Sequence, residues 1–403
     1  MQENLKRNFF WNTLGAVLYQ MATWLTTILV VRLAGFAVSG LLGTAMTLSN
    51  VFITLASYGM RTYQVSDAQS RYSAKAYLQS RFITSGAAAF FCVGLSFCIA
   101  YSAQQRLCVA LYMLYRLSEP LSDVLHGMCQ KDGKLYVAGK SYLLRSVTTL
   151  APFAAGLYFT QSLPFTLLLM SAFTWGEIAL YDVKNARAYV KGQTGGGAWQ
   201  LLRECAPLAV YSVLGTAAAS LPKLFLERGL GTEAMGIYSS VTAPVLLLQV
   251  GATYLFTPLI TLISSRVASG DKKGFAAITA KVSLFIAALA PAGLLGVALI
   301  GKWGLRVFVS AKAEAYAYLL SPMVVAAVLT ALVLFASMLL TILRVLKGLV
   351  IANLASIAVV AIVSAPLIRA FNMQGATYAA IAGLTVQLTL LCAFGIYGAK
   401  KRL

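Results

Sequence analysis

The chain has 403 residues, of which 59% are hydrophobic and only 11% are charged, and its mean hydropathy is +0.78. No soluble fold of this length exposes so little charge, and apolar runs of about 20 residues are what a bilayer core requires of a spanning helix. In a soluble protein the net charge of +20 would suggest a nucleic-acid partner. Here we expect none, because positive charge collects in the cytoplasmic loops of membrane proteins.

The apolar stretches predict an all-α integral membrane protein with twelve transmembrane helices. If the N-terminus lies inside, most basic residues fall in cytoplasmic segments, Arg81 and Arg145 among them, which predicts an N-in, C-in topology. The spans are expected at about residues 9–31, 40–60, 82–102, 107–127, 142–160, 163–182, 205–225, 234–260, 278–300, 316–341, 346–368 and 375–398.

A short motif occurs twice in the chain. Arg32-Leu-Ala-Gly35 recurs 196 positions later as Arg228-Gly-Leu-Gly231, in each case between two apolar segments. Six spans per copy predict a parallel repeat of two six-helix bundles, the arrangement in which transporters place the substrate path between halves. We expect the bundles at residues 1–182 and 205–403. The cytoplasmic linker between them, 183–204, contains the flexible composition Gly192-Gln-Thr-Gly-Gly-Gly197.

The sequence shows no sign of enzyme chemistry. A P-loop pattern is absent, and the cysteines and the single histidine have no metal-ligand spacing, so we expect no catalytic residue, cofactor or metal. A membrane glycosyltransferase or polysaccharide polymerase would need sizeable outer loops carrying catalytic residues. The expected outer loops are short, so the sequence favours a transporter over this class of enzyme.

The fourth expected span carries three charges on one helical face: Arg116, Glu119 and Asp123. One interpretation is a charged stripe that faces a water-filled cavity, with a carboxylate that binds a proton or a cation. The other is an internal ion pair that stabilises the bundle, with Glu119 one turn from Arg116. Charges inside a membrane are costly, so both interpretations give these residues a partner.

Other charged residues leave alternatives open. Glu177 lies deep enough in the sixth span to be a candidate ion-coupling residue, whereas Asp182 is expected at the interface. His126 is interpreted as structural or as a pH sensor. Four cations, Arg32, Arg61, Lys223 and Arg228, are either interfacial anchors or groups that line an anionic substrate path.

The motifs in their order resemble one family. They are Gly59-Met-Arg61 with Tyr63-Gln-Val-Ser-Asp67, then Ser122-Asp-Val-Leu-His-Gly127 with Gln130, and Pro222-Lys-Leu-Phe-Leu-Glu-Arg228 with Gly231-Thr-Glu-Ala-Met-Gly-Ile-Tyr-Ser239. Together with the repeated motif, they resemble bacterial O-antigen and capsule flippases (Wzx-like) of the multidrug/oligosaccharidyl-lipid/polysaccharide exporter superfamily, over about residues 8–265.

The resemblance implies a MATE-like fold and a multi-pass protein of the bacterial cytoplasmic membrane. It implies that undecaprenyl-pyrophosphate-linked oligosaccharide is flipped between the leaflets by alternating access, for surface polysaccharide biosynthesis. Residues expected to bind this substrate are Arg32, Arg61, Arg116, Lys223 and Arg228. Residues expected to couple H+ or Na+ are Glu119, Asp123 and Glu177. Cation-coupled multidrug antiporters of the same fold remain the alternative, and membrane lipid is a partner of either.

Overall fold

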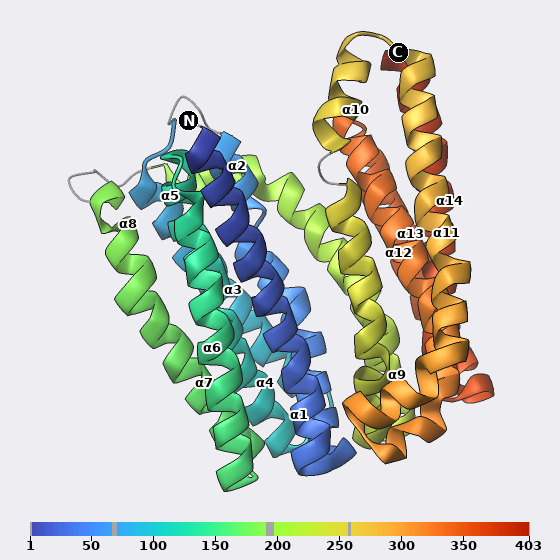
Figure 1. The fold of residues 1–403 in the computed structure, drawn as a ribbon. Helices are drawn as coiled ribbons and strands as arrows, with labels where there is room; N and C mark the ends of the chain where they lie inside the picture. The colour runs from blue at the N-terminus through green and yellow to red at the C-terminus, as the bar shows by residue number, and fades with distance from the viewer. Residues whose placement is uncertain (1, 67–70, 191–196, 257–258, 403) are drawn as a thin grey trace. The chain divides into compact units, whose positions relative to one another are not determined.

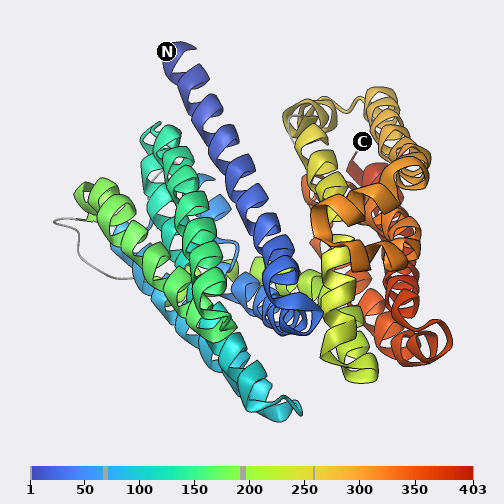
Figure 2. The same cartoon turned by 60° about the horizontal axis from the view of Figure 1, so that its bottom comes forward.

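The computed structural model describes residues 2–66, 71–190, 197–256 and 259–402, and the secondary structure of this part of the chain is entirely helical. Asp67 and Gly192 to Gly196, which belong to sequence motifs named above, lie outside the described residues. The helices form two compact units, unit 1 (Met1–Thr216) and unit 2 (Ala217–Leu403), shown in Figures 1 and 2. The predicted all-α architecture is confirmed.

Unit 1 is a bundle in which the first helix packs against α3, α4, α5 and α6. Its hydrophobic core includes Met60, Tyr77, Val124, Met128 and Leu201. The helices of this unit are α1 (Gln2–Ser57), α2 (Met60–Ser66), α3 (Ala74–Cys98), α4 (Ala103–Arg116), α5 (Ser118–Lys131), α6 (Leu135–Thr160), α7 (Leu163–Glu177), the π-helix η1 (Ile178–Asp182), α8 (Val183–Val190) and the first part of α9 (Ala198–Phe256).

Unit 2 begins inside α9 and has a separate hydrophobic core, which includes Ile263, Phe275, Ile286 and Phe335. The remaining helices are α10 (Leu259–Ala268), α11 (Lys272–Gly304), the π-helix η2 (Leu305–Val309), the 3-10 helix η3 (Ala311–Leu319), α12 (Leu320–Ile342), α13 (Leu346–Phe371) and α14 (Met373–Arg402). The predicted bundle boundaries and the linker 183–204 stay a prediction.

The repeated motif forms the same backbone turn in both units. Gly35 interrupts α1 with φ 81° and ψ −179°, and Gly231 interrupts α9 with φ 88° and ψ 174°. This region of the backbone map is essentially restricted to glycine. In Figure 1, α1 runs from the N-terminus to the far end of unit 1 and returns toward α2. The glycine therefore separates two helical legs, and its recurrence 196 positions later supports the internal repeat.

Eight helices of the described chain are long and apolar enough to cross a membrane, and two of them contain these glycine turns. The expected spans 107–127 and 142–160 correspond to α4 with α5 and to α6, which do not meet this criterion. The helices α4 and α5 are only 14 residues each, and α6 includes Lys140 and Arg145. A multi-pass membrane protein is supported, and the twelve-span topology stays a prediction.

A close helix crossing fixes the geometry of the interior of unit 1. A Cβ on Gly15 of α1 would lie 2.0 Å from the carbonyl oxygen of Gly139 of α6, and one on Gly139 would lie 2.3 Å from the carbonyl carbon of Trp11. Glycine allows the two backbones to touch, as small residues do at helix crossings in membranes. One turn further along, the rings of Tyr19 and Tyr142 stack with centroids 6.2 Å apart.

The glycine turns give a direct test of the repeat. Gly35→Ala and Gly231→Ala should each lower the free energy of unfolding by about 1–3 kcal/mol, because alanine is strained at this φ. Nothing lies within 4 Å of the added Cβ at either position, so the cost is conformational. The control is Gly86→Ala in α3, which is also unobstructed but helical, and should be stabilising by about 0.5–1 kcal/mol. Thermal unfolding of the purified variants measures these changes in stability. Equal changes for all three variants would contradict the special backbone conformation of Gly35 and Gly231.

Candidate functional site

Two ion pairs lie on an accessible part of unit 1. Arg116 Nη1 is 2.7 Å from Glu119 Oε1, with side chains 16% and 23% exposed. Arg61 Nη1 is 2.8 Å from Asp123 Oδ1, with side chains 22% and 27% exposed. Charges inside a membrane protein face the interior of the bundle or a water-filled cavity, and these four side chains are partly exposed. These two pairs, called here the accessible pairs, therefore indicate a wet surface on unit 1.

The first accessible pair sits at a helix break. The fourth expected span is divided at Leu117, where α4 ends and α5 begins. Pro120 explains the break, because proline has no N–H for the carbonyl group of Arg116 and its ring clashes with that carbonyl. The fourth expected span therefore consists of two short helices, α4 and α5, rather than one. Arg116 and Glu119 nevertheless pair across the break, as one of the two sequence interpretations predicted.

Neutral partners complete the first pair. Arg116 Nη2 donates to Asn50 Oδ1 at 3.1 Å. Tyr19 Oη donates to Glu119 Oε1 at 2.5 Å, and it also lies 3.1 Å from Tyr115 Oη. Arginine and carboxylate are thus each held by a second group, so the pair has a defined position.

The second accessible pair has a similar set of partners. Arg61 Nη2 donates to Gln130 Oε1 at 3.0 Å, and Arg61 Nη1 lies 3.3 Å from Tyr142 Oη. Asp123 is also 3.7 Å from Arg81 Nη2. Asp123 therefore contacts Arg61 and Arg81, whereas Glu119, one helical turn away on α5, pairs with Arg116.

Arg81 is a buried arginine that closes the end of α1. Its Nη1 donates to the carbonyl oxygens of Ala56, at 2.6 Å, and Ser57. Thr84 Oγ1 also donates to Ala56 O, at 2.9 Å. The last carbonyl groups of a helix lack intrahelical partners and carry partial negative charge, so a cation stabilises them. Arg81 therefore links α3 to the end of α1 and to Asp123.

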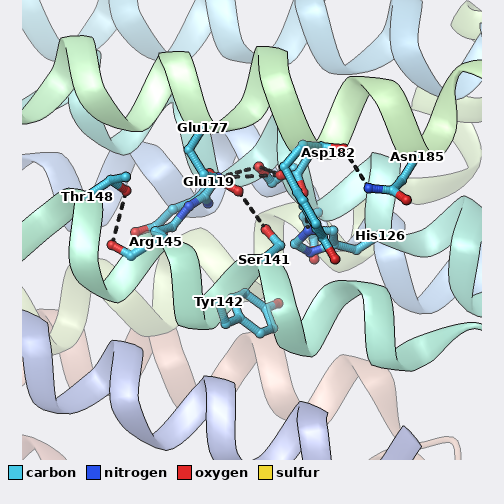
Figure 3. Close-up of polar contacts among 12 residues, drawn as sticks. Glu119, His126, Ser141, Tyr142, Arg145, Thr148, Glu177, Asp182 and Asn185 are labelled. Carbon is cyan, nitrogen blue, oxygen red and sulfur yellow. Dashed lines mark hydrogen bonds and ion pairs between the residues drawn. The ribbon is translucent and has the colours of Figure 1, made fainter.

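A second group of charges lies fully inside unit 1. Arg145 Nη2 is 3.1 Å from Glu177 Oε2 and 3.7 Å from Asp182 Oδ2, and the three side chains are 1%, 3% and 0% exposed. Arg145 Nη2 also donates to Ser122 Oγ. One guanidinium thus faces two carboxylates in a region from which water is largely excluded. Figure 3 shows Arg145, Glu177 and Asp182 in this arrangement.

Three neutral or titratable side chains complete this buried cluster. Ser141 Oγ donates to Glu177 Oε1 at 3.0 Å, and Ser122 Oγ donates to Asp182 Oδ2 at 2.6 Å. His126 Nε2 is 3.1 Å from Asp182 Oδ1, and its side chain is buried. The buried cluster is defined as Ser122, His126, Ser141, Arg145, Glu177 and Asp182.

A π-helix brings the two acids of the buried cluster together. Glu177 ends α7, and Asp182 ends η1, five residues later. In a regular α-helix, residues five apart point in different directions. The i→i+5 bonding of a π-helix widens the turn, which brings such residues onto nearly the same face. Both carboxylates can then reach Arg145.

The structure places the sequence-predicted residues in two groups. Arg61, Arg116, Glu119 and Asp123 form the accessible pairs, and Glu177 belongs to the buried cluster. Three predicted cations lie elsewhere. Arg32, in unit 1, and Arg228, in unit 2, are exposed, and Lys223 is half-buried in unit 2. Of the five predicted cations, Arg61 and Arg116 belong to the accessible pairs.

Sequence reasoning missed three charged groups of unit 1. Arg81 and Arg145 were expected among the cytoplasmic basic residues, and Asp182 at the interface, but all three are buried. Arg145 had one available signal, since it falls inside the expected span 142–160, which lies within α6. For Asp182 the five-residue spacing from Glu177 gave no α-helical signal, because the π-helix is what aligns them.

The buried cluster predicts a large loss of stability when its arginine is removed. Arg145→Met should lower the free energy of unfolding by about 3–5 kcal/mol, because it leaves two buried carboxylates without their cation. Adding Glu177→Gln should recover part of this loss. The control is Arg266→Met, which breaks the exposed 2.7 Å pair with Asp271 and should cost less than about 1 kcal/mol. Chemical unfolding of purified protein measures all three, and equal costs for Arg145→Met and Arg266→Met would contradict the assignment.

Comparisons with known proteins give a fold but no closer relation. No family model matches the chain, and no curated protein matches it. Its structure is similar to an inward-facing multidrug resistance MATE family transporter of the MOP superfamily, with a TM-score of 0.70 at 10% identity, covering 95% of this chain and 94% of that one. The Vibrio cholerae MATE transporter VcmN in the bent form gives 0.59 at 11% identity, covering 100% and 98%.

A third similar structure is described by a reversed polarity of its binding pocket, which suggests a different function. This MOP superfamily transporter from Pyrococcus furiosus has a TM-score of 0.57 at 13% identity, covering 99% of this chain and 95% of that one. At these identities the likeness defines the fold alone. The chain has the fold of MATE transporters of the MOP superfamily.

Proposed function

We propose that the chain is a secondary transporter that moves an undecaprenyl-pyrophosphate-linked oligosaccharide from the inner to the outer leaflet by alternating access. The MATE fold supports the transporter class. The motif resemblance to polysaccharide flippases supports the substrate. The observation that carries the proposal is the pair of partly exposed guanidinium groups of Arg61 and Arg116, held inside a helical unit.

The chemistry of the substrate explains why arginine is useful here. A diphosphate cannot cross hydrocarbon unaided, because burial of an ion costs many kcal/mol. A guanidinium group replaces water around phosphate oxygens with two parallel hydrogen bonds. The lipid tail stays in the bilayer while the headgroup follows the wet surface. In this proposal Arg32, Lys223 and Arg228 add positive charge along the path.

The buried cluster is the proposed place of ion coupling. Glu177 lies with Asp182 and a single arginine, so these three groups carry one excess negative charge when all are ionised, which His126 beside Asp182 balances only when it is protonated. Buried charge without compensation is unfavourable, so the cluster attracts a proton or a small cation. Glu119 and Asp123 are the accessible members of the same proposed coupling set.

A second candidate is a cation-coupled multidrug antiporter. It is favoured by the names of the similar structures, which include a multidrug resistance transporter. The carboxylates of Glu119 and Asp123 would then hold a cationic drug. The two candidates require opposite charges on the substrate, so substitutions at the accessible pairs separate them.

Arg116→Ala should reduce translocation of the lipid-linked oligosaccharide by about tenfold or more, because a hydrogen bond to a charged group contributes about 1.5–3 kcal/mol. Arg116→Lys should restore the rate only in part, since an ammonium group lacks the bidentate geometry. The measurement is flipping of a fluorescent lipid-linked oligosaccharide in proteoliposomes, with the amount of reconstituted protein as the control. Ethidium transport by the same vesicles tests the second candidate. Robust ethidium export without any flipping would reject the flippase proposal.

A further inference from the structure

The two accessible pairs are built from the same four kinds of side chain. In the first, Arg116 contacts the carboxylate of Glu119 and the amide of Asn50, and a tyrosine, Tyr19, contacts the carboxylate. The arginine is 2.7 Å from the carboxylate oxygen and 3.1 Å from the amide oxygen. The amide and the tyrosine both come from α1, whereas the ion pair bridges α4 and α5.

The second pair repeats this composition with different elements. Arg61 of α2 contacts the carboxylate of Asp123, at 2.8 Å, and the amide of Gln130, at 3.0 Å, both on α5. Its tyrosine is Tyr142 of α6, which contacts the arginine rather than the carboxylate. In both pairs, one guanidinium group therefore has an anionic partner and a neutral partner.

The two pairs are neighbours in space. Glu119 and Asp123 are four residues apart on α5, a spacing that places Cβ atoms about 5–6 Å apart on one helical face. The tyrosines of the two pairs, Tyr19 and Tyr142, stack with centroids 6.2 Å apart and an interplanar angle of 13°. Two guanidinium groups, each paired with a carboxylate, thus contact neighbouring turns of α5.

Each carboxylate also has a partner that it keeps if it leaves its arginine. Glu119 accepts a hydrogen bond from Tyr19 at 2.5 Å. Asp123 lies 3.7 Å from Nη2 of Arg81. Neither Nη2 nor Nε of Arg81 has a hydrogen-bond partner in the described contacts. The amides meanwhile hold the two guanidinium groups in position. Exchange of the carboxylates for another anion therefore leaves no charged group of the site without a partner.

We propose that Glu119 and Asp123 occupy, in the unloaded protein, the positions that the two phosphate groups of a diphosphate ligand take at Arg116 and Arg61. The proposal rests on the proposed function, which supplies a diphosphate-linked lipid as substrate. The carboxylates that hold the two arginines are one helical turn apart on α5, a spacing within reach of two linked phosphate groups. The carboxylates keep the arginines paired when the site is empty, and each phosphate group displaces one of them.

The consequence is a gain of affinity when a carboxylate is neutralised. Inorganic pyrophosphate is the probe, titrated calorimetrically into the purified full chain in lipid nanodiscs. Glu119→Gln and Asp123→Asn should each tighten binding by about fivefold, because a partly exposed pair contributes up to about 1 kcal/mol. The double variant should tighten pyrophosphate binding by about 25-fold if the two effects add. Inorganic phosphate should gain only about fivefold, because it contacts one arginine at a time.

Two controls separate this exchange from a general effect of charge. Glu204→Gln removes a carboxylate that pairs with Arg71 at 3.1 Å in the same unit and is 27% exposed, as Asp123 is. It should leave pyrophosphate affinity within about twofold of the wild type. Adding Arg116→Ala should cancel the gain of Glu119→Gln. Undecaprenyl pyrophosphate should bind more tightly than inorganic pyrophosphate if the ligand is lipid-linked, and equally if it is a free diphosphate.

The outcomes distinguish this inference from the proposed function. Pyrophosphate and undecaprenyl pyrophosphate binding that is unchanged or weakened by Glu119→Gln and Asp123→Asn overturns the exchange but leaves an anionic substrate in place. An equal gain for Glu204→Gln also overturns it, since the effect would then be one of overall charge. If neither wild type nor double variant binds either diphosphate, the flippase proposal fails, and the exchange with it.

Discussion

Pairing between guanidinium and carboxylate groups is the interaction on which the interior of unit 1 depends. An isolated charge cannot be buried in a membrane protein without a partner, because the loss of hydration is too costly. Four arginines of this unit meet that requirement in different ways. Arg61 and Arg116 each take one carboxylate at an accessible surface, Arg145 takes two in a dry interior, and Arg81 shares Asp123 while it caps a helix. The helices α1 to α7 are held in register around these contacts.

The two units differ in the chemistry of their interiors, although the glycine turns show a common design. In the described part of unit 2, buried hydrogen bonds between side chains include uncharged pairs, such as Asn353 with Gln387 at 2.6 Å and Tyr238 with Thr377 at 3.0 Å. Glu227 is the one charged residue among the buried polar residues described there. Neutral hydrogen bonds between helices stabilise packing but carry no ion. The ion pairs of the proposed coupling set therefore lie in unit 1, whereas unit 2 contributes Lys223 and Arg228 to the proposed path.

Local rules predicted the parts of this structure that depend on short sequence distances. The helical class followed from apolar length, the contact of Arg116 with Glu119 from their three-residue spacing, and the special role of Gly35 and Gly231 from their repetition. What could not be predicted depends on departures from regular helix. Pro120 divides the fourth span, and the π-helix before Val183 aligns Asp182 with Glu177. The burial of Arg81 and Arg145 is set by contacts with α1, α5 and α7, which are distant in sequence. The topology prediction, which counted basic residues in the expected loops, assigned both arginines to exposed cytoplasmic segments.

The central claim is that the accessible surface of unit 1 recognises a diphosphate through Arg61 and Arg116. An experimental structure of the chain bound to undecaprenyl pyrophosphate tests it most directly. The account predicts phosphate oxygens within hydrogen-bond distance of both guanidinium groups, with Glu119 turned toward Tyr19 and Asp123 toward Arg81. A headgroup bound elsewhere, with the Arg61–Asp123 and Arg116–Glu119 pairs intact, would contradict the claim.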